Sequence, residues 1–285
     1  MRFSKLEATG NDFILIDARN KESDWTKIAE GMCHRNFGVG ADGIITVTQS
    51  KMADLRMRIY NSDGSEAQVS GNGLRCFAKY VIDEKIAIGP EIKVETLAGI
   101  RIIKTSSYKG KVNKAIVNMG IPRLKPAEIP VSLNDYPTVR GDSTALMPEC
   151  RLIIDGRNLT VSLVSMGNPH AVFYSSEPVA LFPLAKIGEQ VENHEVFPER
   201  TNFEVVKILG KDKIEARVWE RGVGETLSCG SGACAIAVTA MLRSLVNDHV
   251  DIKLPGGTLT VSWDRVGEVH LEGPVNEVFI GEWLR

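Results

Sequence analysis

The sequence has few of the features that mark membrane, secreted or metal-binding proteins. No apolar run approaches the roughly 18 residues of a membrane-spanning helix, and the start, MRFSKLEATGNDF, lacks the uninterrupted apolar core of a signal peptide. The five cysteines include no CxxC pair and the five histidines are scattered, which argues against a disulfide framework and a structural zinc site. The formal net charge of -2 favours neither nucleic acid nor an anionic membrane as a partner. We therefore expect a cytoplasmic, enzyme-sized protein whose cysteines fill the core or take part in chemistry.

An internal repeat indicates two domains of one fold. A chain of 285 residues can form two domains that each bury a core, and residues 58–81 align with residues 217–240. The repeated features, in chain order, are Gly10-Asn11 with Gly167-Asn168, Arg58 with Arg217, Glu66 with Glu225, Gly71 with Gly230, Gly73 with Gly232, and LAGIRI (97–102) with PGGTLT (255–260). Because these matches keep the same order, we interpret them as duplication of one unit. The period is too long for a solenoid.

Most segments of each half have the pattern of strands, and only a few have that of helices. Residues 73–84 carry apolar side chains at helical spacing, and the counterpart is expected at about 231–246. A further helix is expected at 24–34, and Asp155-Gly156 has the composition of a tight hairpin turn. The sequence thus predicts an α+β fold with mainly antiparallel strands. We expect the domain boundary near 122, where the Pro-rich segment 122–150 crosses between the halves.

The repeat places Ser70 and Cys229 at the same point, each followed by Gly-x-Gly and then an apolar helical pattern. The free N–H groups of such a helix start favour a carboxylate or phosphate. A thiol there is expected to have its pKa lowered from ~8.5, so that Cys229 can act as a nucleophile or a base. The remaining cysteines are expected in the core; these are Cys33, Cys76, Cys150 and Cys234.

Two acid/base groups at matched positions indicate the class of chemistry. If they approach one carbon from opposite faces, one group removes a proton while the other supplies one, and the stereocentre inverts. The sequence shows no Lys motif for pyridoxal phosphate, no nucleotide fingerprint and no cluster of metal ligands. We therefore predict a racemase or epimerase that uses no cofactor and no metal, in which hydrogen bonds and helix dipoles stabilise the carbanion.

The motifs closely resemble those of the diaminopimelate epimerase family. They occur in order as GNDF (10–13), GADG (40–43), NSDGSE (61–66), SGNGLRC (70–76), GNPH (167–170), TNFE (201–204), WERGVGET (219–226) and CGSGACA (229–235). The resemblance implies pyridoxal-independent interconversion of LL- and meso-diaminopimelate for lysine and peptidoglycan synthesis. It also implies two pseudo-symmetric domains, each a β-barrel-like roll around a central helix, at 1–122 plus about 270–285 and at 123–269.

The resemblance also assigns roles to individual residues. The family's two acid/base cysteines correspond to Cys229 and Ser70, and His170 would help to tune one of these groups. The substrate-binding positions correspond to Asn11, Asn61, Gly71, Asn72, Asn168, Asn202, Glu220, Arg221, Gly230 and Ser231. The expected partner is a small amino acid substrate, without nucleic acid or membrane, and the oligomeric state is left open, a homodimer included.

Two residues depart from the family pattern. Gly43 stands where relatives carry glutamine in the pocket, so a substrate contact there is expected to be lost or altered. Ser70 matters more, because a hydroxyl with a pKa near the ~15.7 of water is a far weaker acid than a thiol at ~8.5. Three accounts of Ser70 are open: an engineered Cys→Ser replacement, which the retained neighbours favour, a natural one-thiol isomerase or lyase, and a non-catalytic amino acid binding homologue.

Overall fold

The computed structural model describes residues 1–132 and 147–284, which form two compact units. Unit 1 comprises Met1–Asn118 and the C-terminal segment from Glu272, and unit 2 comprises Met119–Leu271. Part of the Pro-rich segment expected to cross between the halves lies outside the described residues. The elements are mostly strands with few helices, so the predicted α+β class is confirmed.

Unit 1 surrounds one helix with strands that are mainly antiparallel. Its elements are β1 (Arg2–Ala8), β2 (Asn11–Asp17), α1 (Trp25–Cys33), β3 (Gly43–Thr48), β4 (Leu55–Asn61), β5 (Glu66–Ala67), α2 (Gly71–Asp83), β6 (Glu91–Thr96), β7 (Gly99–Tyr108), β8 (Lys111–Gly120, which runs across the unit boundary) and β18 (Asn276–Glu282). β2 pairs in parallel with β3, and β4 with β6. β18 pairs antiparallel with β1, which attaches the C-terminal segment to unit 1.

Unit 2 repeats most of this order of elements, with two added 3-10 helices and with a strand, β9, at its start where unit 1 has β18 at its end. It contains η1 (Pro126–Glu128), β9 (Glu149–Ile154), β10 (Arg157–Ser165), β11 (Pro169–Tyr174), η2 (Val179–Leu181), α3 (Leu184–Glu192), β12 (Asn202–Gly210), β13 (Lys213–Glu220), β14 (Gly224–Thr226), α4 (Gly230–Leu242), β15 (His249–Leu254), β16 (Gly257–Ser262) and β17 (Val269–Pro274, also across the boundary). The parallel pairs β11–β12 and β13–β15 correspond to β2–β3 and β4–β6.

The register of the strands repeats as well. Phe13 pairs with Gly43 in unit 1, and His170 pairs with Asn202 at the corresponding place in unit 2. Two matched ion pairs accompany this register: Arg58 Nε lies 2.7 Å from Glu66 Oε1, and Arg217 Nε lies 2.8 Å from Glu225 Oε1. The residues that align in the sequence therefore hold equivalent places in the two units.

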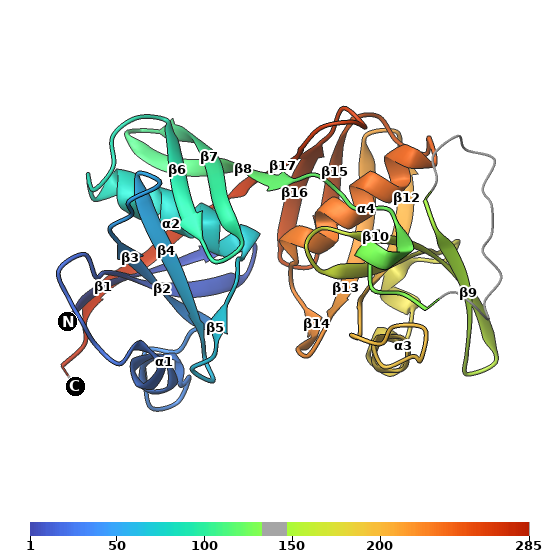
Figure 1. Ribbon diagram of the computed structural model, residues 1–285, viewed down its shortest axis with the longest axis horizontal. Helices are drawn as coiled ribbons and strands as arrows, with labels where there is room; N and C mark the ends of the chain where they lie inside the picture. The colour runs from blue at the N-terminus through green and yellow to red at the C-terminus, as the bar shows by residue number, and fades with distance from the viewer. Residues whose placement is uncertain (133–146, 285) are drawn as a thin grey trace. The chain divides into compact units, whose positions relative to one another are not determined.

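A 13-residue helix forms the centre of each unit (Figure 1). α2 packs against β1, β2, β3 and β7, and α4 packs against β10, β11, β12, β15 and β16. The segment from Gly232 to Met241 is buried throughout, because α4 is apolar on all sides and strands enclose it. Both helices begin a little earlier than predicted, since the glycines already belong to the first turn. α4 ends at Leu242, before the predicted end at 246.

Candidate active site

Ser70 and Cys229 are the N-cap residues of α2 and α4. Both have extended backbone, with φ and ψ of -140° and 124° at Ser70 and -122° and 118° at Cys229. Ser70 Oγ accepts a hydrogen bond of 3.1 Å from the N–H of Gly73, and Cys229 Sγ accepts one of 3.4 Å from Gly232. Each side chain thus satisfies one of the N–H groups that a helix start leaves without a partner in the helix. The remaining N–H groups of the first turn are suited to an anion.

The surroundings of Cys229 oppose ionisation of its thiol. The residue is only 5% exposed, and burial raises the pKa of the thiol well above its ordinary value. The charge of Glu220 raises the pKa further, while the Ser231 hydroxyl and the Gly232 N–H lower it. The expectation of a lowered pKa is therefore wrong in its net direction, because the sequence does not show how deeply the sulfur is buried.

A chain of polar side chains leads from Cys229 into the core of unit 2. Cys229 Sγ lies 3.5 Å from Ser231 Oγ, which accepts a 3.4 Å hydrogen bond from the amide of Asn168. The Asn168 oxygen lies 3.0 Å from His170 Nε2, and His170 Nδ1 lies 2.6 Å from Glu204 Oε1. Three of the predicted site residues in unit 2 are thereby brought together around Cys229: Asn168, His170 and Ser231.

The helix start of unit 1 has a different polar environment. The amide of Asn72 donates to Asn11 Oδ1 at 3.3 Å, and the amide of Asn11 donates to Asp42 Oδ2 at 2.5 Å. Arg75, which is fully buried, donates to Asn72 Oδ1 at 3.0 Å. The structure therefore brings Asn11 and Asn72 together beside Ser70.

The other predicted binding residues already have partners within their own units. Asn61 is exposed and donates to Ser65 Oγ at 3.0 Å. Asn202 is buried, donating to the carbonyl of Pro169 at 2.7 Å and accepting from the backbone N–H of Arg221 at 2.9 Å. Glu220 accepts from the Thr226 hydroxyl at 2.6 Å, and the Arg221 guanidinium donates to the carbonyl of Glu199 at 3.0 Å.

Glu204 belongs to this site but is not among the residues predicted from the sequence. Glu204 is fully buried and is the one charged residue in the apolar run NFEVV of β12. A carboxylate in such a run must find a partner in the core, and this signal was available from the sequence. Its partner, His170, lies on the neighbouring strand β11.

Gly43 has a structural reason for being glycine. A Cβ atom added there would lie 2.6 Å from the carbonyl oxygen of Tyr60, which is closer than real Cβ contacts allow. A glutamine therefore could not be accommodated on this backbone without a shift of β3 against β4.

The remaining cysteines are buried and free, as predicted. Burial raises the pKa of Cys33 and Cys76 to about 12 and that of Cys150 to about 11. Cys76 lies inside α2, so it does not replace the acid/base group at position 70.

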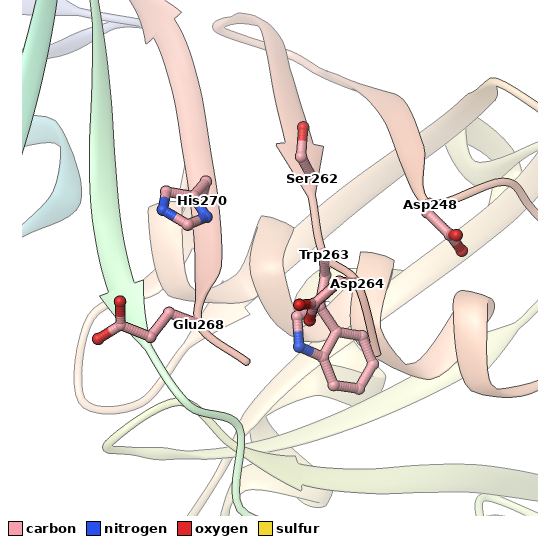
Figure 2. Close-up of a pocket in the computed structure, with 6 residues that line it drawn as sticks. All are labelled: Asp248, Ser262, Trp263, Asp264, Glu268 and His270. Atoms are coloured by element: carbon pink, nitrogen blue, oxygen red, sulfur yellow. The ribbon is translucent and has the colours of Figure 1, made fainter. Parts of the chain in front are cut away.

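A pocket of about 470 Å³ on unit 2 is a separate feature, lined by Asp248, Ser262, Trp263, Asp264, Glu268 and His270. Figure 2 shows Ser262 on β16 and His270 on β17; Trp263, Asp264 and Glu268 lie in the loop between these strands, and Asp248 lies directly before β15. None of the predicted site residues lines this pocket.

In the described parts of the chain, the helices are all too short or too polar to cross a membrane. The fold is shared with solved structures, including the following two. A phenazine biosynthesis protein of the PhzF family from Bacillus anthracis superposes with a TM-score of 0.67 at 17% identity, covering 100% of this chain and 99% of the other. A hydroxyproline epimerase from Agrobacterium vitis gives a TM-score of 0.67 at 14% identity, with coverage of 99% and 91%. The chain therefore belongs to the fold class of these two proteins.

The sequence comparisons identify the family within this class. The family model described as diaminopimelate epimerase matches residues 3–125 and 162–278. A diaminopimelate epimerase from Methanococcus maripaludis is 42% identical over 284 residues, which are 99% of this chain and 99% of that protein. The chain therefore belongs to the diaminopimelate epimerase family, and with it to the isomerases.

Proposed function

We propose that this isomerase interconverts LL- and meso-diaminopimelate by proton transfer between two protein groups, without a cofactor, and so serves lysine and peptidoglycan synthesis. The observation that carries the proposal is the pair of N-cap side chains, Ser70 and Cys229, on equivalent helices of a family member. The reaction requires these two groups to act on one α-carbon from opposite faces. In this proposal the two units are the two epimerase-like domains of a cytoplasmic enzyme. The oligomeric state is left open, a homodimer included.

The chemical step removes one proton from the α-carbon and adds another proton to its opposite face. In one direction the Cys229 thiolate takes the α-proton, and the Ser70 hydroxyl delivers a proton to the opposite face. The negative charge that develops on the substrate carboxylate would be stabilised by N–H groups in the first turns of α2 and α4, at Gly71, Asn72, Gly230 and Ser231. The reverse direction exchanges the roles of the two groups.

The remaining predicted residues would recognise the rest of the substrate. Diaminopimelate has two amino acid ends, so its site must bind ammonium and carboxylate groups together. Carboxylate and amide oxygens suit the ammonium groups, and a guanidinium suits the distal carboxylate. These roles fall to Asn11, Asn61, Asn168, Asn202, Glu220 and Arg221.

Ser70 makes this form of the enzyme slow. The difference of about seven pKa units between a hydroxyl and a thiol corresponds to ~10 kcal/mol. If half of this difference is felt in the transition state, the rate falls on the order of a thousandfold. The residues next to Ser70 keep the pattern of the family, which favours an engineered Cys→Ser replacement. A one-thiol isomerase or lyase is the second candidate. The second candidate rests on Cys229, which supplies a thiol at one helix start while the other helix start carries a hydroxyl.

The test is α-proton exchange in D₂O, followed by NMR with LL- and meso-diaminopimelate incubated separately. We expect slow exchange with the protein as it is, and exchange of both isomers that is about a thousandfold faster with Ser70→Cys. The product separates the alternatives, because a lyase gives an alkene or a keto acid instead of the inverted centre. A protein that retains the ligand without exchange would be a binding homologue, and no exchange in either version would reject diaminopimelate as the substrate.

Two further variants locate the chemistry. In the Ser70→Cys background, Cys229→Ser should return exchange to the slow level, because one thiol is again missing. Cys150→Ser is the matched control, since Cys150 is also buried but lies in β9. Equal loss in both variants would point to damaged folding instead of a lost base.

A further inference from the structure

The two helix starts differ in what lies beneath them. A Cβ atom added to Gly232 in unit 2 would lie 3.0 Å from Glu204 Oε1. A Cβ atom added to Gly73 in unit 1 would lie 3.1 Å from Ile45 Cδ1. His170, the partner of Glu204, pairs with Asn202 across β11 and β12. The equivalent pair across β2 and β3 in unit 1 is Phe13 with Gly43. The helix start that carries the thiol therefore lies over a carboxyl group that is paired with a histidine, whereas the other lies over the apolar side chains of Ile45 and Ile59.

The hydrogen bonds of this pair can all run in one direction toward the sulfur. The Asn168 oxygen accepts from His170 Nε2–H, which leaves the Asn168 amide to donate to Ser231 Oγ. Since Ser231 Oγ already accepts a hydrogen bond, its own proton is available to the neighbouring Sγ of Cys229. This direction exists only while Nε2 of His170 carries a proton, because a bare Nε2 would turn the Asn168 amide around.

Glu204 determines which nitrogen of His170 carries that proton. Burial raises the pKa of the Glu204 carboxyl, and its second oxygen, Oε2, is buried without a partner in the described structure. A bare carboxylate oxygen in that place would be costly, so a neutral carboxyl group that donates to Nδ1 fits the site best. His170 then holds its own proton on Nε2.

We propose that Glu204 is a positioning residue for Cys229: it fixes the Nε2–H form of His170, which through Asn168 turns the Ser231 hydroxyl toward Sγ. The proposal rests on the proposed function only in treating Cys229 as an acid/base group. The charged or titratable groups that act on Cys229 are Glu220 and Glu204, and the hydrogen bonds from Ser231 and Gly232 oppose their effect. Glu204 therefore favours the thiolate through the hydrogen-bond chain, although its charge, when present, would disfavour it.

The test measures the pH midpoint for alkylation of Cys229 by iodoacetamide, read from the Cys229 peptide by mass spectrometry between about pH 8 and about pH 12, because the pKa of this thiol lies well above its ordinary value. The midpoint is used because it reports the ionisation of the thiol, whereas the absolute rate also depends on the access of the reagent to the sulfur. Glu204→Gln can still donate to Nδ1, so its rates should stay within about threefold of the parent. Glu204→Ile copies Ile45 of unit 1 and should raise the midpoint by about one pH unit, which is a tenfold loss of reactive thiolate at a given pH.

A second readout is the ¹⁵N NMR signal of the His170 ring, which distinguishes its tautomers and does not respond to a merely structural role. We expect the Nε2–H form in the parent and in Glu204→Gln, and a mixture in Glu204→Ile. The proposal would be overturned by an Nδ1–H form in the parent or by an unchanged midpoint in Glu204→Ile. It would also be overturned by a lowered midpoint in both variants, because Glu204 would then act by its charge.

A further variant protects the test against unfolding. If Glu204→Ile fails to fold by near-ultraviolet circular dichroism, Ser231→Ala cuts the last link of the chain at a partly exposed position. It should raise the midpoint by the same amount, and an unchanged midpoint would reject the hydrogen-bond chain. None of these measurements uses diaminopimelate, so failure of the substrate assignment and failure of this proposal remain distinguishable.

Discussion

Glu204 holds the place beneath the helix start of unit 2 that Ile45 holds in unit 1. The two units therefore share strand order and register but not the chemistry around their N-cap residues. Around Ser70 the polar neighbours are amides and a buried guanidinium, whereas around Cys229 they end in a carboxyl–imidazole pair. We expect the two acid/base positions to differ in acidity for this reason as well as through the exchange of sulfur for oxygen.

The charge of Glu220 is a second control on Cys229. Its carboxylate raises the pKa of the thiol, so Glu220→Gln should lower the pH midpoint of Cys229 alkylation by about one unit. Glu225→Gln is the matched control, because Glu225 is exposed, lies on the neighbouring strand β14 and pairs with Arg217. A midpoint that rises in Glu220→Gln, or moves equally in the control, would show that the carboxylate does not act on the sulfur directly.

The local parts of this fold could be predicted from the sequence because their signals are local. Apolar spacing located α1 and α2, although α2 begins two residues before its predicted start at 73. Asp155 and Gly156 both have positive φ, 53° and 73°, as the predicted tight hairpin requires. The matched pairs Arg58–Glu66 and Arg217–Glu225 form as ion pairs because residues aligned in the repeat lie on equivalent strands.

The electrostatics of the site could not be predicted in the same way. The pKa of Cys229 depends on burial by segments far away in the sequence, so the helix start alone gave the wrong direction. The contact of His170 with Glu204 depends on the parallel pairing of β11 with β12, which no short motif encodes. Helix α3 was also missed, although it buries Leu184, Ile187 and Val191 on one face.

Gly43 is expected to be required for the fold of unit 1. Because a Cβ there would lie 2.6 Å from the carbonyl of Tyr60, Gly43→Ala should lower the free energy of unfolding by about 1–3 kcal/mol, measured by urea titration. Gly31→Ala is the control, since a Cβ at Gly31 meets nothing within 4 Å. Gly31 is an exposed position of α1, so that substitution should be neutral or stabilise by up to about 1 kcal/mol. Equal effects at both positions would contradict the close approach of β3 to β4.

The ion pairs of Asp12 should make the stability of unit 1 depend on pH. Burial raises the pKa of Asp12, but hydrogen bonds and charges from Arg35 and Lys5 outweigh it and hold the pKa below its ordinary value. Asp12 Oδ2 lies 2.6 Å from Lys5 Nζ, and Asp12 Oδ1 lies 2.9 Å from an Arg35 nitrogen. A carboxyl whose pKa is lower in the folded state stabilises the fold above its unfolded pKa of ~3.9, and this contribution is lost as the pH falls through the folded value.

Asp12→Asn should therefore cost about 2 kcal/mol of unfolding free energy near pH 7 and much less near pH 3, where the parent has begun to lose the same charge. Urea titrations at both pH values measure the difference. Glu22→Gln, at an exposed position before α1, is the control and should change neither value appreciably. If the cost of Asp12→Asn were the same at both pH values, Asp12 would act through hydrogen bonds that asparagine cannot replace, and the ion pairs with Lys5 and Arg35 would not contribute to stability.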